Sequence, residues 1–357
     1  MNKNLGLAAL LSALLLAGCG EQPSASASQS PALGAQSAGK PATGSSTAAA
    51  RVFVPNPVQS TGEQSLSDGK DAASAVPTSA YKGVTLRNLD GSGYLRGDWA
   101  VVVSETGTPA YGTAFNFDRS QDQFEQVMAY FWITEAQLYL QSLGFGNELP
   151  AVNRHQQAIR VSQWGQDNSF QTDKQDEIRL GKGGVDDAED GEVIVHEYGH
   201  AVHAAQVPGF GSSLEAGSIG EAFGDYLAVI VGQAVARREG VAIRTPLACV
   251  ADWDSVSYTT TTPHCLRRLD TDKHYPEDVR GEVHADGEIW SGALLNIRTA
   301  LGERNADRVI INAQFRFAPD TSFAAAAQAT VDTARNMLGT SAAGTVRQVF
   351  VARGILK

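Results

Sequence analysis

The sequence is poor in cysteine and proline and has no excess of basic residues. Only 3 Cys and 13 Pro occur in 357 residues, which excludes a disulfide-rich miniprotein and a collagen-like fibre. The 28 Lys and Arg are outnumbered by 39 Asp and Glu, so the net charge is −11 and we expect no nucleic-acid partner. Hydrophobic residues make up 43% of the chain, enough for a packed core and too many for a wholly disordered protein.

The apolar run near the N-terminus is short. Residues 5–17 follow Lys3 and are almost purely apolar, but a membrane-spanning helix needs about 20 such residues. The pattern therefore predicts an export signal over residues 1–18. Its end, Leu16-Ala17-Gly18-Cys19, resembles the lipobox of bacterial lipoproteins, which implies that Cys19 is acylated and anchors the chain to a bacterial membrane. The alternative is an ordinary secretory signal and an extracellular protein.

Residues 19–80 are dominated by small and polar side chains, with Phe53 the only aromatic residue before Tyr81. Such a composition buries too little apolar surface to offset the entropy of ordering it, so we expect a tether. Docking of Val52-Phe53-Val54-Pro55 on the folded part, as an extended arm, stays open.

Two cysteines remain, Cys249 and Cys265. Export would place them where thiols oxidise, so we predict a disulfide that closes the loop between them. Two unpaired thiols are the alternative.

The remaining chain predicts an α+β fold with two lobes. Residues 81–206 mix strand patterns, near 99–103, 159–161 and 177–180, with a helical pattern over 120–143. After Asp190 the pattern is helical, over 191–205, 219–237, 286–301, 304–315, 322–338 and 345–352. We expect a mixed N-terminal lobe over 81–206, a mainly helical C-terminal lobe over 207–357, and the chemistry where they meet.

One short motif carries that chemistry. His196-Glu197-Tyr198-Gly199-His200 lies in a predicted helix, where four residues make slightly more than one turn. Both imidazoles then leave one face, about 6 Å apart along the axis, and can bind one metal ion. In this pattern the glutamate, Glu197, is the general base.

Three positions could supply the third metal ligand. His203 lies about 10.5 Å along the axis from His196, too far for a shared ion. The metzincin pattern fails, because it needs a histidine where this chain has Gln206. Glu221, on the next predicted helix, completes a His, His, Glu zinc site with one position open to water. Asp225, one turn further, would accept the second N–H of a ligating imidazole.

These residues resemble the gluzincin metallopeptidases of the thermolysin and fungalysin families. The segments 214–222, 282–290 and 167–170 are similar, in family order, to those that carry the third ligand, a transition-state histidine and a substrate-binding asparagine. The resemblance implies a two-lobed thermolysin-like fold with the active-site helix between the lobes, Zn²⁺, and a peptide or protein substrate. It assigns His284 to the oxyanion and Asn168 to the substrate backbone. Asp278, six residues before His284, is the candidate that would orient His284.

The chain also departs from the family pattern. Ser212 occupies the position of an assisting tyrosine, and Gly220 precedes Glu221 where the family has Asn. The acidic run Asp186, Asp187, Glu189 and Asp190 has two interpretations, carboxylates that favour a helix N-terminus or a Ca²⁺ site.

The sequence thus predicts an exported or surface-anchored zinc endopeptidase. Two alternatives stay open: a gluzincin aminopeptidase, which captures a free N-terminus, and an inactive surface binding lipoprotein. The aminopeptidase is disfavoured because residues 183–186 lack the acidic motif of such enzymes, and the inactive protein because the complete motif is present.

Overall fold

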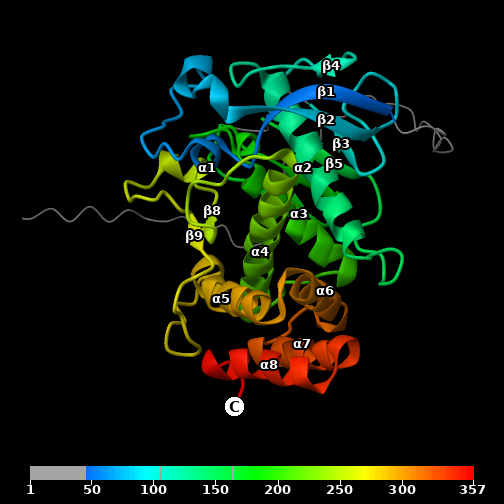
Figure 1. Ribbon diagram of the computed structural model, residues 1–357, viewed down its shortest axis with the longest axis vertical. Coiled ribbons are helices and arrows are strands. Elements are labelled where there is room, and N and C mark those ends of the chain that lie inside the picture. The colour runs from blue at the N-terminus through cyan, green and yellow to red at the C-terminus, as the bar shows by residue number, and fades with distance from the viewer. Residues whose placement is uncertain (1–45, 105–106, 163–164) are drawn as a thin grey trace, which may run out of the picture. The chain divides into compact units, whose positions relative to one another are not determined.

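The computed structural model describes residues 46–104, 107–162 and 165–357, which belong to one compact unit (Figure 1). The predicted signal segment and Cys19 lie outside the described residues, as does the tether up to residue 45.

The last part of the predicted tether is folded, which corrects its boundary. β1 (Ser46–Phe53) pairs antiparallel with β2 (Tyr81–Leu89) and parallel with β4 (Ala114–Phe115), in the order β2-β1-β4. Val52, Phe53 and Val54 are fully buried. The mean composition of residues 19–80 does not reveal this short apolar strand. Its backbone groups form hydrogen bonds with two neighbouring strands.

Asn56, also within the predicted tether, begins α1 (Pro57–Thr61) as its N-cap and donates from its amide to Asp190. The 3₁₀ turns η1 (Ala73–Ala75) and η2 (Thr78–Ala80) lead into β2. The segment 46–80 is therefore an integral part of the fold, and the open question about residues 52–55 is answered by their burial in a sheet.

A second sheet lies against the long helix α2 (Asp122–Ser142). Its strands are β3 (Ala100–Val102), β5 (Gln157–Arg160), β7 (Glu177–Arg179) and β6 (Phe170–Thr172), in the order β3-β5-β7-β6. The first three run parallel, and β6 pairs antiparallel with β7 at the edge. β6 also contacts the helix that follows in the chain, α3, so this edge of the sheet borders the histidine motif.

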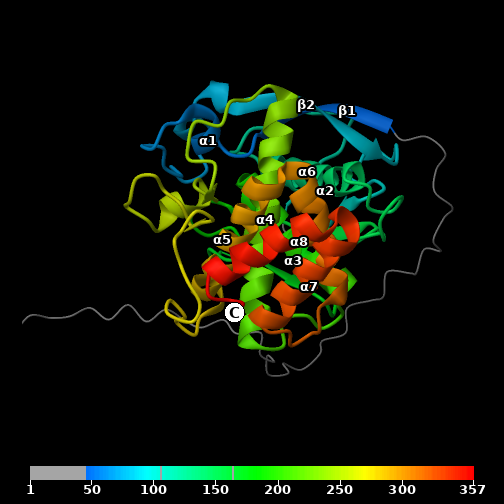
Figure 2. The same ribbon diagram turned by 60° about the horizontal axis from the view of Figure 1, so that its bottom comes forward.

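Helices make up most of the rest of the chain, as predicted. α3 (Gly191–Gln206) and α4 (Leu214–Glu239) pack side by side in the middle of the described chain, with the β1–β2 sheet at one end and the C-terminal helices at the other (Figures 1 and 2). The C-terminal helices are α5 (Val283–Leu301), α6 (Glu303–Ala313), α7 (Phe323–Leu338) and α8 (Thr340–Ala352), with η5 (Gln314–Arg316) after α6.

α4 begins well before the predicted start at residue 219, because the Ser213 hydroxyl caps it by accepting from the N–H of Ala216. In the described chain it is the one helix long and apolar enough to cross a membrane by length and composition alone. Its most apolar window is 83% buried inside the protein, as expected of a core helix.

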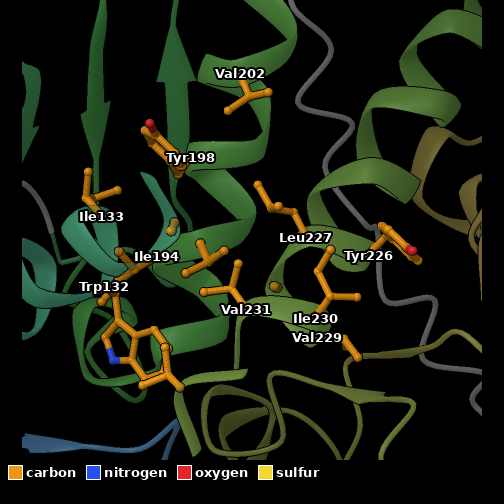
Figure 3. Close-up of a cluster of buried hydrophobic side chains, with 14 of the residues drawn as sticks. Trp132, Ile133, Ile194, Tyr198, Val202, Tyr226, Leu227, Val229, Ile230 and Val231 are labelled. Atoms are coloured by element: carbon orange, nitrogen blue, oxygen red, sulfur yellow. The ribbon is translucent and has the colours of Figure 1, made fainter. Parts of the chain in front are cut away.

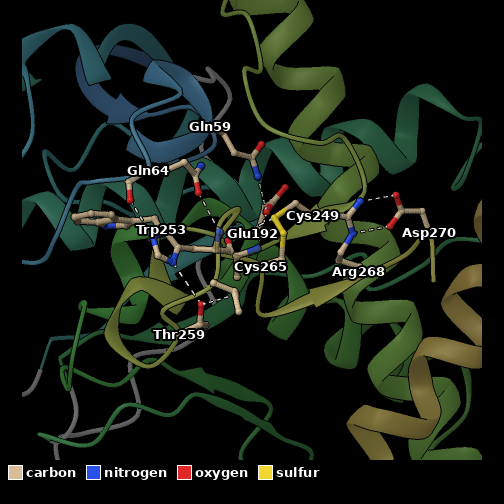
Figure 4. Close-up of a disulfide and its surroundings, with 12 residues drawn as sticks. Gln59, Gln64, Glu192, Cys249, Trp253, Thr259, Cys265, Arg268 and Asp270 are labelled. Atoms are coloured by element: carbon tan, nitrogen blue, oxygen red, sulfur yellow. Dashed lines mark hydrogen bonds and ion pairs between the residues drawn. A yellow bond between two sulfur atoms is a disulfide. The ribbon is translucent and has the colours of Figure 1, made fainter.

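Cys249 and Cys265 form a disulfide beside the short hairpin of β8 (Cys249–Val250) and β9 (Arg267–Arg268) (Figure 4). The amide of Gln59 donates to Glu192 at 2.8 Å. Gln64 accepts from the N–H of His264 at 3.0 Å. The segment before β2 therefore packs against both the disulfide loop and the start of α3.

Candidate metal centre

The helix α3 presents one apolar face and one functional face. Asp190 caps it by accepting from the N–H of Glu192. Ile194, Tyr198 and Val202 are buried, and Figure 3 shows them beside Trp132 and Ile133 of α2 and the apolar residues 226–231 of α4. Packing on this face fixes the rotation of α3 and leaves the histidines directed elsewhere.

Two glycines let α3 and α4 approach closely. A Cβ added at Gly199 would lie 2.8 Å from the Cα of Gly224, and one added at Gly224 would lie 2.7 Å from Nδ1 of His196. Any side chain at either position would push the helices apart. The close approach brings Glu221, one turn before Gly224, to the histidines of α3.

Three donor atoms converge at this contact. Nε2 of His196 lies 3.2 Å from Nε2 of His200. The Glu221 carboxylate lies 3.3 Å from Nε2 of His196 and 3.6 Å from Nε2 of His200. The three ligand atoms all lie within 4.8 Å of one another. Two nitrogens and one carboxylate oxygen are a donor set that zinc prefers.

A carboxylate on the far side of the ring fixes the tautomer of His196. Its Nδ1 lies 2.8 Å from Oδ1 of Asp225. The two carboxylate oxygens of Asp225 each accept a 2.7 Å hydrogen bond from Arg267, which keeps the carboxylate ionised as an acceptor. Nδ1 thus keeps its proton, and Nε2, which faces Glu221 and His200, is the nitrogen that is left to bind a metal in place of a proton. Oε2 of Glu221 is buried and has no hydrogen-bond partner, although it lies within ion-pair distance of His196. The residues therefore fit a bound Zn²⁺.

The charges of the site residues also favour a bound cation. Burial opposes a charge on His196, but Asp225 and Glu221 outweigh it and raise its pKa to about 10. Burial lowers the pKa of His200 to about 4, despite the nearby Glu221. Burial also opposes the charge of Glu221, yet the histidines hold its pKa below the usual range. Positive charge between the two histidines and Glu221 is therefore electrostatically favourable, and a bound divalent cation can supply it.

Glu197 lies on the same helix, one residue after His196. It is only 6% exposed, and its Oε2 has no hydrogen-bond partner. Burial raises the pKa of Glu197 to about 7, against the attraction of His196. A carboxylate with this pKa can take up and release a proton near neutral pH.

His284 joins the site from the first turn of α5. Its Nε2 lies 3.2 Å from Oε2 of Glu221, and its side chain is 49% exposed. Nδ1 lies 2.6 Å from Glu282, the N-cap of α5, whose carboxylate also accepts from the N–H of His284 and Ala285. The predicted orienting residue, Asp278, instead accepts from the backbone N–H of His274 at 2.7 Å. Glu282 thus replaces it, because the helix cap is closer to the imidazole than the preceding loop.

Asn168 is exposed in the segment that leads into β6. Its backbone runs close to Gly181, where an added Cβ would lie 2.5 Å from the Asn168 carbonyl oxygen. This places the residue beside the edge strand that borders α3, where an extended peptide could pair with the sheet.

His203 lies outside the centre, as its distance along the helix predicts. It is buried, with its ring 4.2 Å from that of Phe210 and 4.7 Å from that of Phe223. Burial keeps its pKa well below the ordinary value, so it is a neutral residue of the core.

The acidic run ahead of α3 serves several purposes. Asp190 caps the helix, Asp186 forms a 3.1 Å ion pair with Lys182, and Glu189 pairs with Arg119 at 2.8 Å. Asp187 is not part of these pairs.

Sequence reasoning missed Arg267 and Glu282. Arg267 belongs to no motif, and only the β8–β9 hairpin brings it to Asp225. Glu282 precedes an apolar helical pattern, and this N-cap position was the one signal that could have identified it.

Comparisons with known proteins agree with this geometry. Residues 181–355 match the model of the fungalysin metallopeptidase family (M36), and this range contains the histidines, Glu221 and His284. The precursor of protealysin, a metalloproteinase from Serratia proteamaculans, superposes with a TM-score of 0.54 at 17% sequence identity, covering 72% of this chain and 86% of that one. No curated protein matches the chain.

The structural similarity confirms the predicted mixed α/β, thermolysin-like fold. The family match indicates that the chain is a zinc metalloendopeptidase.

Proposed function

We propose that this protein is an exported zinc endopeptidase in which His196, His200 and Glu221 hold the metal and Glu197 is the general base. The observation that carries the proposal is the convergence of the three donor atoms within 4.8 Å, beside a buried carboxylate that has an unpartnered oxygen. When bound, Zn²⁺ would polarise the substrate carbonyl and lower the pKa of a water toward about 7.

Glu197 takes the proton that leaves the attacking water. As the new carbon–oxygen bond forms and the carbon–nitrogen bond of the peptide breaks, Glu197 passes this proton to the leaving amine. Its burial favours both steps, because neither of its protonation states is strongly disfavoured near neutral pH.

His284 serves the oxygen of the carbonyl, on which negative charge develops. Glu282 accepts the hydrogen bond at Nδ1, so a second donor, Nε2 on the side of the ring that faces Glu221, is present when the ring is protonated on both nitrogens. Preorganised donors of this kind stabilise the transition state more than the ground state.

Asn168 and the edge strand β6 would hold the substrate peptide in an extended conformation. The exposed position of Asn168 and the contact of β6 with α3 support this role. Arg267 and Asp225 act behind the metal ligands, because they fix the proton of His196 on Nδ1.

The substitution Glu197→Gln tests the role of the base. We expect kcat to fall by about 10²–10⁴-fold, because general-base catalysis contributes that much, while the zinc content stays the same. Cleavage of casein and of N-terminally blocked peptides should be measured together with zinc by atomic absorption. Retained turnover in the variant would overturn the assignment.

Blocked peptides also separate the two alternatives. An aminopeptidase would cleave only peptides with a free N-terminus, and an inactive binding protein would cleave neither kind, with or without a chelator. The endopeptidase cleaves both kinds, and chelation stops it.

We propose in addition that Cys19 carries a lipid anchor, on the strength of the lipobox-like segment that ends there. Mass spectrometry of the membrane fraction should find the N-terminal peptide beginning at an acylated Cys19. An unmodified cysteine, or a chain released entirely into the medium, would contradict this proposal.

A further inference from the structure

A pocket of about 270 Å³ lies at the start of α4. The first two turns of α4, the loop of residues 275–279 and the first turns of α5 and α7 form its walls. Ser218 lines it three residues before Glu221, so these two residues are about 4.5 Å apart along the helix axis. We call this feature the α4 pocket. None of its described lining residues is a proposed zinc ligand, so it is separate from the metal centre although close to it.

The walls of the α4 pocket are mostly apolar and aromatic. Leu214 is 46% exposed and Val279 is 38% exposed, so both belong to its open rim. Phe323 is buried below them, and its ring centroid lies 5.5 Å from that of Tyr275 in an edge-to-face arrangement. Walls of this kind can pack against an aliphatic chain, and the faces of aromatic rings attract cations.

Two carboxylates share the pocket with these walls. Oε1 of Glu215 accepts from the Tyr275 hydroxyl at 2.9 Å, and Oε2 accepts from the backbone N–H of Phe323 at 2.6 Å. The buried carboxylate of Asp286 accepts from the backbone N–H groups of residues 280–281 at 2.6 and 3.0 Å. These bonds fix both carboxylates in place. An ionised carboxylate has about four acceptor positions, so each can still accept further hydrogen bonds.

The negative charge of the α4 pocket has no cation beside it. No Lys, Arg or His is among the residues that line the pocket in the described chain. The groups of ligand atoms close enough to share a metal ion, among the described residues, include neither Glu215 nor Asp286. The pocket is therefore suited to an organic cation with an apolar stem. The net charge of −11 on the chain adds to the attraction.

A peptide bound at the metal centre is long enough to reach this pocket. Val279, on the pocket rim, lies three residues before Glu282, the N-cap of α5 that bonds to His284. Ser218 is within one helical turn of Glu221. An extended peptide advances about 3.3 Å per residue, so only a few residues of a substrate separate the scissile bond from the pocket.

We propose that the α4 pocket is an exosite, a binding site outside the catalytic centre, for a basic side chain of a peptide substrate. The aliphatic part of that side chain packs against Leu214 and Val279, and its charged end donates to Glu215 beside the ring of Phe323. Arginine is preferred to lysine, because a guanidinium can donate to both oxygens of one carboxylate and can stack on an aromatic ring. The choice of a peptide rests on the proposed function.

Blocked peptides with one cleavage site test the exosite. A single arginine is moved through the positions on both sides of the scissile bond, and matched peptides carry norleucine, an uncharged aliphatic residue, in its place. We expect one position at which arginine raises kcat/KM at least about tenfold over norleucine, because hydrogen bonds between charged groups are strong when partly buried. This preference should decrease as the salt concentration rises.

Two variants and a matched control locate the effect. Val279→Lys places a cation at the rim and should lower the arginine preference to less than about threefold, because like charges repel. Glu215→Gln keeps the shape of the side chain but removes its charge, and should act in the same way. Val351→Lys changes a similarly exposed valine on α8 and should keep the full preference. All three should retain the parent zinc content and the parent kcat/KM for the norleucine peptide, which shows that they are folded.

Binding to the zinc-loaded Glu197→Gln chain separates this proposal from the proposed function. Isothermal titration calorimetry should show tighter binding of the arginine peptide than of the norleucine peptide. If the parent chain cleaves neither peptide but this difference in binding is found, the proposed function fails and the exosite stands. Cleavage of both peptides with equal kcat/KM at every position, or a preference for norleucine, overturns the exosite. An arginine preference that Val279→Lys and Glu215→Gln leave unchanged overturns it as well.

Discussion

Two groups of converging side chains in this protein differ in the elements that carry them. His196, His200 and Glu221 lie on long helices, whose rotation is fixed by buried apolar faces. Asp167, Asp187 and Asp254 lie on a loop and two 3₁₀ turns. The first group contains nitrogen donors and the second only carboxylates.

The difference shows how each group is positioned. Zinc needs a few donors in a defined tetrahedral arrangement, which rigid helices can supply. The three carboxylates of the second group meet only because the segments that carry them pack together.

Removing the carboxylate of the helical group should have the largest effect. Glu221→Gln replaces the one charged zinc ligand by a neutral amide, so we expect loss of bound zinc and of peptidase activity. Zinc should be measured in dialysed protein beside casein cleavage. Glu239→Gln, on the last turn of the same helix, is the control and should retain both. A variant that keeps stoichiometric zinc would show that Glu221 is not a ligand.

Removing His284 should have the next largest effect. His284→Ala takes away a donor to the developing oxyanion, so kcat should fall by about 10²–10³-fold while zinc stays bound. Single-turnover and steady-state kinetics with a blocked peptide measure this change. His274→Ala, an exposed histidine in the preceding loop, should be close to the parent enzyme.

The partner of His284 can be identified in the same assay. Glu282→Gln exchanges a charge-assisted hydrogen bond for a neutral one and should lower kcat by roughly five- to tenfold. Asp278→Asn should not change kcat, because Asp278 bonds to the backbone of His274. The opposite ranking would restore Asp278 as the orienting residue.

Asp225→Asn should weaken the metal centre without removing a ligand. The amide no longer fixes the proton of His196 on Nδ1, and zinc affinity should fall by about 10–100-fold. Competition with a chromogenic chelator measures this affinity. Asp307→Asn controls for loss of a buried carboxylate in the same helical region and should bind zinc normally. Equal losses in the two variants would mean that Asp225 acts only through stability.

Breaking the disulfide should affect the loop-borne group and leave the helical group almost unchanged. The double substitution Cys249→Ser and Cys265→Ser opens a loop with a sequence separation of 16, so the free energy of unfolding should fall by about 3 kcal/mol. Urea unfolding and zinc content measure the two effects. Zinc loss that parallels the loss of stability would contradict the separation of the two groups.

Much of the helical group could be read from the sequence because its geometry is local. The spacing of His196 and His200 sets their distance as soon as the segment is helical. The rejection of His203 rested on the same rise per residue, and the histidine lies in the core. Glu221 needed one further step, the choice of a carboxylate on the next helix.

The errors have a different origin. The boundary of the tether was wrong because an average over residues 19–80 hid the strand β1, which is stabilised by pairing with β2 and β4. Asp278 was chosen for its position in the chain, but the cap of α5 places Glu282 nearer the imidazole. Arg267 reaches Asp225 only through the β8–β9 hairpin, which no sequence motif predicts.

The sequence by itself determined the helix that carries the histidines, and it predicted the residue types of the proposed zinc ligands and of the proposed base beside them, because these depend on the fixed geometry of one or two helices. Only the tertiary structure decided that β1 belongs to the fold, that Arg267 supports Asp225, and that Asp167, Asp187 and Asp254 meet. Such meetings join segments that are far apart in the chain. They follow from how the segments pack, and no local periodicity encodes that packing.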